Sequence, residues 1–513
     1  MPGDSPTVAE ILRHQARSRG DHALLVCDGD RISYADADSR SAELARGLIA
    51  QGGGKGTHVG LLYPNGTEFV VGMLAAARIG AVVIPFSTFV TARELREQLV
   101  DSDSEILLAA ASFRSHDYVQ RLGEALSHAE IGGDERLFVT ATPQLRHVIV
   151  NSERVYRLGE AVDPGLLDAM EDDVEGCDPL AIVYTSGSTS TPKGVVHTHA
   201  GLLGHQRNLN EIRGLTAKDK LFCNSPFFWI GGFAFGLLAS LVAGSTLVCS
   251  NATDAGQTLD LLEAEKPTMT NGFAAGIAQL ADHPSFAARD LSSMRRGNLY
   301  PIMAPGARPA DPELRHNMLG MTEAGSVVLI SGDESDQPES RRGSFGKPAP
   351  GFQTMIVDPD SAGVGELCVR GPHLMQGYYK RSREECFDGD GWFHTGDLVR
   401  VDADGFFYFV GRRSTMIKTS GANVSAAEVE KAIARVTGTQ AHVVGIPDTE
   451  RGELVAAVVV QPVLDEAALR ERLKEELSAY KIPRRFIALP RAEIPLLSSG
   501  KVDARQLKKL FDA

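Results

Sequence analysis

Short apolar segments alternate with segments of helical periodicity over residues 7–86, and this alternation is the strongest constraint on the fold. Residues 7–20, TVAEILRHQARSRG, predict a helix with Thr7 as its N-cap and Gly20 just past its end. Next we predict strands at 23–27, 58–63 and 81–86, which alternate with helices at 35–52 and 67–80. Such alternation is typical of largely parallel sheets that are covered by helices.

The pattern changes twice along the 513 residues, a length that already favours two or more domains over a single core. Beyond about residue 343, short apolar runs lie between glycines and prolines, which predicts antiparallel strands. Near residue 411 the pattern becomes a compact α+β one, so we place the domain boundary in the polar run GRRSTMIKTSGAN.

The C-terminal region contains two predicted helices, 425–438 and 465–480, and two predicted strands, 442–447 and 454–460. The first helix begins with a capping box formed by Ser425 and Glu428. In the second helix, three leucines fall on one face: Leu469, Leu473 and Leu477.

Residues 224–253 carry no charge, a run long enough to cross a bilayer. The run also contains four glycines, a proline and many Ser and Thr residues, and Gly244 stands where a helix would end. We therefore predict a buried helix followed by a buried strand, not a transmembrane segment. The N-terminus has no basic start followed by an apolar run, so we expect no signal peptide.

The composition excludes some functions. A net charge of −14 argues against a nucleic-acid-binding surface. The six cysteines are scattered without zinc or redox spacing, so we expect buried, reduced thiols in a cytoplasmic protein: Cys27, Cys177, Cys223, Cys249, Cys368 and Cys386.

The loop after the predicted strand LAIVY is rich in hydroxyl groups and ends near a lysine, in the sequence YTSGSTSTPKG. Glycine lets backbone N–H groups turn toward an anion, hydroxyl groups add donors, and Lys193 adds a positive charge. The loop therefore suits a phosphate. It is not a Walker A loop, because Pro192 precedes the lysine and no Ser or Thr follows it. By itself the loop could equally be a flexible surface linker.

Three further motifs carry charged residues on short loops. In GMTEAG, Thr322 and Glu323 suit a phosphate contact and a magnesium ligand, although a helix N-cap is an equal alternative. In GWFHTGD, Asp397 follows a predicted glycine turn and could accept the two hydroxyls of a ribose, with Arg412 as a helper. In LSSGKVD, Lys501 lies on a glycine-containing loop that could reach a distant site.

Taken together and in this order, these motifs resemble the adenylate-forming superfamily, which includes acyl-CoA synthetases, aryl-CoA ligases, adenylation domains and beetle luciferases. The resemblance covers nearly the whole chain. It implies an α/β fold with a large N-terminal domain, 1–411, made of βα-wound sheets plus a distorted antiparallel barrel. A hinge at 412–415, including Thr415, would connect it to a small mobile α+β domain, 416–513.

The resemblance also implies an activity: a carboxylate attacks the α-phosphorus of ATP, and a thiol, usually coenzyme A, then displaces AMP from the acyl-adenylate. The cofactors would be ATP, Mg²⁺ and coenzyme A. The implied ATP/AMP-binding residues are Thr185, Ser186, Gly187, Ser188, Thr189, Lys193, Leu319, Gly320, Thr322, Asp397, Arg412 and Lys501. Among them Lys501 and Thr322, with Glu323 as the magnesium ligand, would be catalytic. After the C-terminal domain rotates, Ser420 and Gly421 would line the CoA site.

The sequence departs from the family's pattern at several positions. Ser190 replaces a usual glycine, Leu319 a usual tyrosine whose ring packs on adenine, and Ala426 a usual proline. Thr415 replaces a usual Asp or Lys at the hinge. The adenine-binding segment before GMTE also looks short, so APG at 304–306 corresponds to it only loosely. These departures leave open an unusually tuned enzyme.

The segment PFFWIGGFAFG, residues 226–236, predicts the acyl site. It lacks the aspartate that amino-acid adenylation domains use, so a hydrophobic carboxylic acid is expected, with Phe228, Trp229, Gly231 and Met321 as acyl-binding residues. Packing in the core is the alternative for its aromatic residues. The predicted enzyme is a monomer or homodimer; the alternatives are loading of a carrier protein's phosphopantetheine and a catalytically weak nucleotide or acyl-AMP binding protein.

Overall fold

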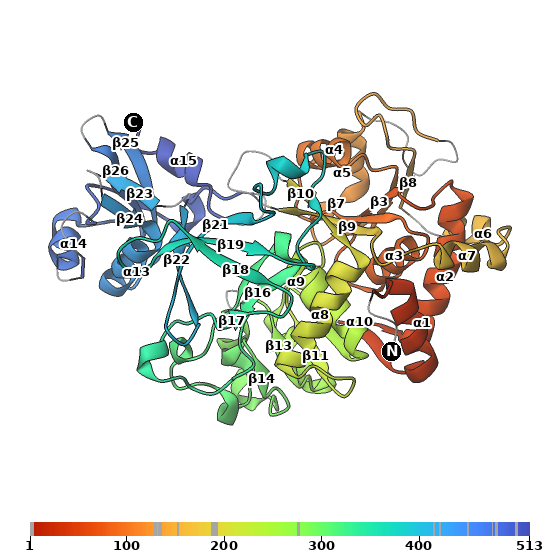
Figure 1. The fold of residues 1–513 in the computed structure, drawn as a ribbon, viewed down its shortest axis with the longest axis horizontal. Coiled ribbons are helices and arrows are strands. Elements are labelled where there is room, and N and C mark those ends of the chain that lie inside the picture. The colour runs from red at the N-terminus through yellow and green to blue at the C-terminus, as the bar shows by residue number, and fades with distance from the viewer. Residues whose placement is uncertain are drawn as a thin grey trace. The chain divides into compact units, whose positions relative to one another are not determined.

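The structure, a computed structural model, describes residues 5–127, 131, 136–150, 153–185, 193–273, 277–413, 416–419, 422–448, 451–474, 476–477, 481–497 and 501–512. The chain forms two compact units (Figure 1). The first unit comprises Met1–Gln353 and Val369–Phe393, and the second comprises Thr354–Cys368 and His394–Ala513.

The first unit contains two large sheets. The seven-stranded sheet has the order β20 (Gly377–Tyr378), β10 (Lys193–Thr198), β9 (Pro179–Thr185), β4 (Val82–Pro85), β3 (His58–Leu62), β5 (Ile106–Ala109) and β8 (His147–Ile149). The six-stranded sheet has the order β14 (Arg296–Gly297), β13 (Met269–Asn271), β11 (Lys220–Cys223), β12 (Thr246–Cys249), β1 (Ala23–Cys27) and β2 (Asp30–Ser33). Most neighbouring strands are parallel, as predicted; the antiparallel pairs are β1–β2, β9–β10 and β10–β20.

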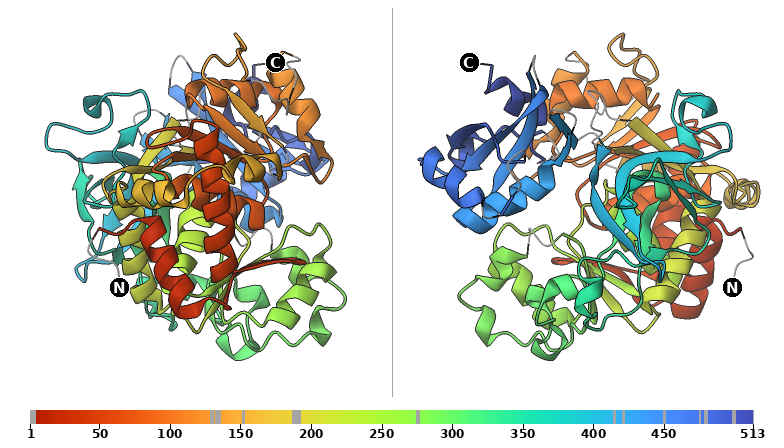
Figure 2. Two further views of the ribbon diagram at one scale, coloured as in Figure 1. Left: turned by 90° about the vertical axis from the view of Figure 1, so that its right-hand side faces the viewer. Right: turned by 60° about the vertical axis from the view of Figure 1, so that its left-hand side comes forward.

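Helices follow the strands in the predicted alternation (Figures 1 and 2). They are α1 (Val8–Arg19), α2 (Tyr34–Ala50), α3 (Thr67–Arg78), α4 (Ala92–Asp101), α5 (Tyr118–Ala125), α6 (Glu153–Gly159), α7 (Pro164–Asp172), α8 (His199–Arg213), α11 (Ala255–Glu265) and α12 (Ala278–Ala281). The helix predicted from Thr7 is confirmed, with the Thr7 side chain accepting from the N–H of Glu10. Between α4 and α5 lies a short hairpin of β6 (Ser112–Phe113) and β7 (His116–Asp117).

Helix α3 lies within the main core of this unit. Every residue of α3 except Glu68 is buried. Its side chains belong to one apolar cluster with residues of both large sheets, including Leu61 of β3 and Leu247 of β12. A helix that is apolar on all sides is stable only when it is covered on all sides, which explains why 67–80 shows so little amphipathic character.

The uncharged run, 224–253, is buried as predicted. It forms α9 (Ile230–Gly232), a π-helical stretch over Phe233–Leu238, α10 (Ala239–Ala243) and then β12. Gly244 is left-handed at the end of α10, with φ of 71°. Gly232 is required by close approach, because a Cβ there would lie 2.1 Å from the carbonyl oxygen of Pro226.

After α12 the first unit continues with short 3₁₀ turns and a three-stranded antiparallel sheet of β15 (Leu319–Met321), β16 (Ser326–Ile330) and β17 (Lys347–Pro348). A four-stranded sheet follows, most of whose residues belong to the second unit: β18 (Gln353–Val357), β19 (Gly365–Arg370), β21 (Phe393–Val401) and β22 (Phe407–Arg412). The antiparallel strands predicted beyond about residue 343 are therefore confirmed for β21 and β22.

The C-terminal part of the second unit is the predicted α+β structure. Its sheet contains β24 (Ala422–Ser425), β23 (Met416–Thr419), β26 (Gly452–Val460) and β25 (Ala441–Asp448), with β27 (Arg485–Leu489) also paired to β26. Its helices are α13 (Ala426–Thr437), α14 (Glu466–Leu473) and α15 (Ala504–Lys509). Helix α14 is shorter than the predicted 465–480, because it ends at Leu473; Leu477 is nevertheless buried in the same core.

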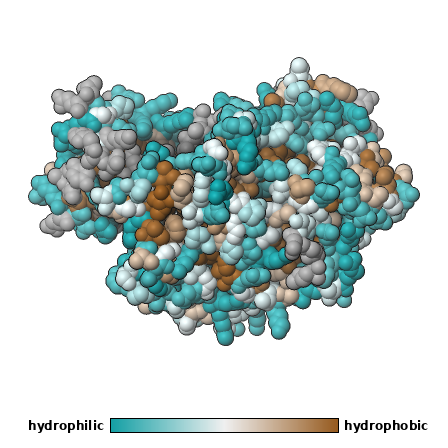
Figure 3. Space-filling view, viewed as in Figure 1, coloured by the Kyte–Doolittle hydropathy of each residue, from teal (hydrophilic) through white to brown (hydrophobic). Residues whose placement is uncertain are grey.

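The predicted boundary at 411 and the hinge at 412–415 stay predictions, because Ser414 and Thr415 lie outside the described residues. All six cysteines are free; five are buried as expected, but Cys177 is exposed. On the face shown in Figure 3, hydrophilic residues cover most of the surface and hydrophobic residues form smaller groups.

Candidate active site

The predicted phosphate loop connects two neighbouring antiparallel strands of the first unit. The register of β9 and β10 places Thr185 directly opposite Lys193. Ser186, Gly187, Ser188, Thr189, Ser190 and Pro192 lie outside the described residues. Thr185 and Lys193, at the two ends of the loop, are nevertheless paired on neighbouring strands of one sheet. The choice between a phosphate loop and a flexible surface linker stays a prediction.

Thr322 and Glu323 lie in a single 3₁₀ turn, Thr322–Ala324, between β15 and β16. The turn ends at Gly325, which is left-handed with φ of 66°, a conformation that glycine adopts without strain. No α-helix begins here and no side chain caps the turn. The alternative of a helix N-cap is therefore wrong, and the carboxylate of Glu323 is not engaged in capping.

Tyr378 connects this turn to the loop lysine. Its O–H donates to Oε1 of Glu323 at 2.7 Å, and Nζ of Lys193 lies 4.7 Å from the centroid of its ring. Tyr378 is positioned by the pairing of β20 with β10, where it lies opposite Val195. The structure thus gathers Lys193, Tyr378 and Glu323, of which sequence analysis had not identified Tyr378.

Two buried side chains hold the turn from the side of β10 and α8. His197 donates from Nε2 to the main-chain oxygen of Thr322 at 2.7 Å, and Gln206 donates to that of Gly325 at 3.2 Å. Burial lowers the pKa of His197 to about 4, so the ring is neutral near pH 7 and can donate from Nε2. Sequence analysis missed both residues; the available signal was His and Gln side chains interspersed among the apolar residues of 194–209.

The buried histidines predict an acid-sensitive fold. Burial lowers the pKa of His197 and His199 to about 4 and that of His205 to about 3, from 6.5. The unfolded chain therefore binds more protons below pH 6.5, and stability falls with pH in this window. We expect the free energy of unfolding to drop by about 1.5 kcal/mol per histidine between pH 6.5 and 5, measured by urea unfolding.

The variant His197→Gln provides the control, because it removes one of these titrations and should flatten the pH dependence. Most carboxylates titrate below this window. A free energy of unfolding that stays constant from pH 6.5 to 5 would contradict the prediction.

In the second unit, Asp397 and Arg412 lie opposite each other on β21 and β22. Arg412 donates from Nε to Oδ1 of Asp397 at 2.6 Å; the joint role of the two residues in binding a ribose stays a prediction. The prediction that Asp397 follows a glycine turn is wrong, because Asp397 lies inside β21. The preceding residue, Gly396, is left-handed with φ of 72°. This left-handed residue distorts the strand locally next to a buried carboxylate.

A second carboxylate, Glu366 of β19, lies beside this pair and was missed. It is buried and accepts from the N–H of Gly396 at 2.9 Å and from Nη1 of Arg413 at 2.8 Å. Nδ1 of His394 lies 3.3 Å from Oε2 of Glu366. Glu366 therefore fixes the backbone of the residue that precedes Asp397.

Lys501 lies in the second unit, next to an isolated antiparallel bridge between Leu496 and Val502. The N–H of Leu497 donates to the main-chain oxygen of Lys501 at 2.7 Å. Partial desolvation lowers the pKa of Lys501, and the positive charge of Arg412 adds to the effect. The charge of Arg412, the residue that binds Asp397, thus acts on the ammonium group of Lys501.

The predicted acyl-binding residues lie in the first unit, and two of them belong to a row of edge-on aromatic contacts. Ring centroids of Phe89 and Phe228, of Phe228 and Trp229, and of Trp229 and Phe273 are 5.6, 5.5 and 5.5 Å apart. Phe89 and Phe273, at the two ends, are 38% and 51% exposed. In contrast, Phe233 is fully buried against Phe69, so it is a core residue.

The remaining predicted residues of the first unit lie on or beside β15 and α9. Met321 is buried at the end of β15, Leu319 is partly buried at its start, and Gly320 is exposed between them. Gly231 is partly buried in α9. Ser420 and Gly421, the predicted CoA-binding residues, lie outside the described residues.

The partial exposure of Trp229 leads to a prediction that separates a pocket wall from a core residue. Trp229→Ala should shift the preference toward bulkier acids and leave KM for ATP nearly unchanged, because the predicted ATP contacts are other residues. The melting temperature and the ranking of acids should be measured on the same variant. A core residue would instead lose about 3–5 kcal/mol of stability on truncation and affect all acids alike, and that result would remove Trp229 from the acyl site.

The motifs and the geometry agree with comparisons to known proteins. A family model described as "AMP-binding enzyme" matches residues 12–379, and one described as "AMP-binding enzyme C-terminal domain" matches residues 428–501. The chain belongs to the AMP-binding enzyme family. Its relatives include proteins named feruloyl-CoA synthase and indoleacetate–CoA ligase, and the chain is an AMP-forming acid–CoA ligase that binds ATP.

Individual relatives support the assignment. The chain is 30% identical to a putative acyl-CoA synthetase, YngI, of Bacillus subtilis, over 98% of this chain and 96% of that protein. It is also 30% identical, over 99% and 100% of the two chains, to 3-[(3aS,4S,7aS)-7a-methyl-1,5-dioxo-octahydro-1H-inden-4-yl]propanoyl:CoA ligase of Mycobacterium tuberculosis. Its structure is similar to that of o-succinylbenzoate CoA synthetase (MenE) from Bacillus subtilis in complex with its acyl-adenylate, with a TM-score of 0.75, 25% identity and 97% of each chain covered.

Among the described residues of this AMP-binding enzyme, no helix has the length and apolar character needed to span a membrane.

Proposed function

We propose that this AMP-binding enzyme activates a hydrophobic carboxylic acid, fatty or ring-containing, and transfers the acyl group to coenzyme A. The aromatic row from Phe89 to Phe273 carries this proposal, since it gives an uncharged wall that is partly open to solvent. Aromatic and apolar linings favour apolar acyl groups. The Mycobacterium tuberculosis relative acts, by its name, on a bicyclic propanoate, which supports a ring-containing acid.

The first step brings a carboxylate anion onto a polyanion, so the protein must neutralise charge and align the reactants. We assign the triphosphate to the hairpin that ends in Thr185 and Lys193, and the α-phosphate to Thr322. The ribose hydroxyls are assigned to Asp397, with help from Arg412. Lys501 bridges the attacking carboxylate and the α-phosphate in this step, and then gives way to the thiol, for which Ser420 and Gly421 are proposed.

The residues fit a magnesium ion that arrives with ATP. Glu323 is half-buried, and Tyr378 engages Oε1 of its carboxylate, which leaves Oε2 for a metal. The described residues contain no cluster of three or more metal-ligating side chains, and Mg²⁺ needs only one or two carboxylates when phosphate oxygens supply the rest. The ion would neutralise charge on the phosphates when bound.

The proposed function is tested by ATP–pyrophosphate exchange with a panel of acids, followed by thioester formation. Exchange that depends on aliphatic or aromatic acids supports an adenylating enzyme, and no exchange with any acid would leave a nucleotide-binding protein. Thioester formation with coenzyme A, compared with a phosphopantetheinyl carrier protein, then identifies the acceptor. We also propose a cytoplasmic monomer or homodimer, a location with which the six free cysteines agree.

A further inference from the structure

A small cavity lies in the first unit next to the proposed acyl and adenylate segments. Its volume is about 70 Å³, and residues that line it include Arg213 of α8, Phe235, Thr270, Met318, Ile330 and Glu334. Phe235 belongs to the predicted acyl segment, and Met318 directly precedes β15, which leads to Thr322. A cavity of this size is too small for a whole ligand but has room for the end of one.

Arg213 lines this cavity without a carboxylate partner among the described residues. Its guanidinium carbon lies 3.9 Å from the centroid of the Phe235 ring. Nη2 donates to Oδ1 of Asn210 at 3.0 Å and to the main-chain oxygen of Phe235 at 3.1 Å, both neutral acceptors. Nε is buried without a hydrogen-bond partner among the described atoms. Burial lowers the pKa of Arg213 to about 9, and no carboxylate contributes to that pKa.

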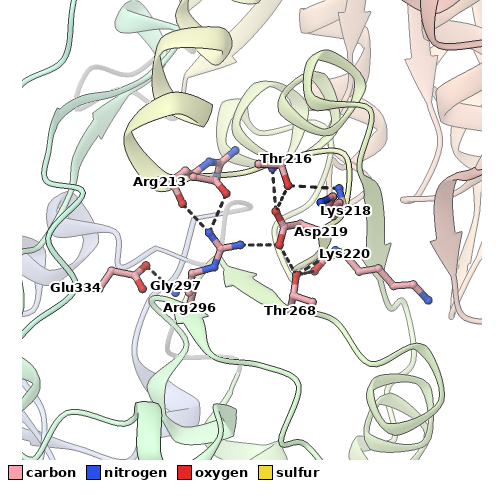
Figure 4. Close-up of polar contacts among 10 residues, drawn as sticks. Arg213, Thr216, Lys218, Asp219, Lys220, Thr268, Arg296, Gly297 and Glu334 are labelled. Atoms are coloured by element: carbon pink, nitrogen blue, oxygen red, sulfur yellow. Dashed lines mark hydrogen bonds and ion pairs between the residues drawn. The ribbon is translucent and has the colours of Figure 1, made fainter. Parts of the chain in front are cut away.

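The other charged groups around Arg213 are already engaged. Figure 4 shows Arg296 directed toward the main-chain oxygen of Arg213 and toward Asp219, whose Oδ1 it contacts at 2.5 Å. Glu334 accepts from the N–H of Gly297 at 3.1 Å.

Two further charged residues line the cavity and also have partners. Arg315 pairs with Asp336 at 2.6 Å, and Asp333 accepts from Ser335 and Gln337. A partly buried arginine without a counter-charge is costly unless something supplies an acceptor. In the described part of the chain, Arg213 therefore offers a donor and a positive charge to whatever enters the cavity.

We propose that Arg213 binds an acceptor oxygen, of a carboxylate or a ketone, at the far end of the acid substrate. The inference rests on the proposed function and narrows it: the acid is hydrophobic along its length but carries oxygen at the end opposite to the reacting carboxylate. The aromatic row contacts the apolar part, and Phe235 holds the guanidinium in place by stacking. Arg213 is thus a specificity-determining residue.

Two matched series of acids test this inference on the full-length enzyme by acid-dependent pyrophosphate release. One series is octanoate, the corresponding keto acid with oxygen on the penultimate carbon, and octanedioate. The other is phenylpropanoate with hydrogen, acetyl or carboxyl in the para position. In at least one series we expect kcat/KM to be about tenfold or more higher for an oxygen-bearing acid, since the hydrogen bond is charge-assisted. The keto and carboxyl members show which oxygen is preferred.

Arg213→Met should abolish this preference, with kcat/KM falling about tenfold or more for the oxygen-bearing acids and staying level or rising for the unsubstituted ones. Arg146→Met is the matched control, because Arg146 also stacks on a phenylalanine, Phe138, and donates to a main-chain oxygen, but does not line the cavity. Arg213→Lys, which retains the charge, should restore part of the preference. If Arg213→Met proves unstable in thermal melting, Arg213→Gln and Arg213→Lys take its place.

An unchanged ranking of acids in a folded Arg213 variant, or an equal loss for all acids, would overturn this inference and leave the proposed function intact. A wild-type enzyme that prefers the unsubstituted acids in both series would overturn it as well. If no acid promotes pyrophosphate release, the proposed function itself fails.

Discussion

Lys501→Ala should lower acid-dependent pyrophosphate release by about 100- to 1000-fold, while thioester formation from a supplied acyl-adenylate stays close to the wild-type rate. Removing one donor to developing charge typically costs this much. The reason for the asymmetry is that the proposed contact, between an ammonium group and both reacting anions, exists only in the first half-reaction. The two half-reactions should be measured separately, with purified acyl-adenylate for the second.

Lys508→Ala is the matched control for this experiment, since Lys508 is an exposed lysine on α15, a few residues further along the chain. It should leave both half-reactions near the wild-type rate. Lys501→Arg retains a positive charge and should retain more adenylation than the alanine variant. An equal loss in both half-reactions of Lys501→Ala would refute the assigned role.

Glu323→Gln should raise the magnesium concentration required for half-maximal adenylation and lower the maximal rate by about 100-fold, without a change in melting temperature. The carboxamide has the shape of the carboxylate and can still accept from Tyr378, but it lacks the charge that the metal requires. The measurement is a magnesium titration of pyrophosphate release at saturating ATP and acid.

Tyr378→Phe separates the metal ligand from its neighbour. It removes the O–H donor to Oε1 of Glu323 but leaves the carboxylate and the aromatic ring beside Lys193. We expect a smaller loss of rate and a smaller shift of the magnesium titration than in Glu323→Gln. A magnesium titration of Glu323→Gln that coincides with that of the wild type would show that Glu323 is not a ligand.

The local elements of this chain could be predicted because their signals act over a few residues. Thr7 caps α1, and Gly244 ends α10 in a left-handed conformation, as each residue's own backbone preferences dictate. The βα alternation likewise predicts helix-covered parallel sheets, since each apolar segment needs a covered face. The order of the charged motifs was sufficient to indicate the family, because these motifs are contiguous in the sequence.

Errors arose where a neighbouring element overrides a local signal. The glycine before Asp397 was interpreted as a turn, yet β21 runs from Phe393 to Val401 through this glycine, and Asp397 pairs with Arg412 of β22. The leucine periodicity of 465–480 was interpreted as one long helix, yet α14 ends at Leu473 and Leu477 reaches the same core without helical structure. In both cases burial against other strands or helices outweighs local propensity.

What the sequence determined by itself is therefore most of the elements and the family, and it supplied the candidate site residues, whose roles stay predictions. Only the tertiary structure decided which side chains surround them. Tyr378 reaches Glu323 because β20 pairs with β10, and His197 reaches Thr322 because β10 and α8 lie behind β15 and β16. That Arg213 lacks a carboxylate partner among the described residues is likewise visible only once its neighbours are known. Such contacts depend on strand order and register, which join residues far apart in the chain and leave no periodic pattern in the sequence.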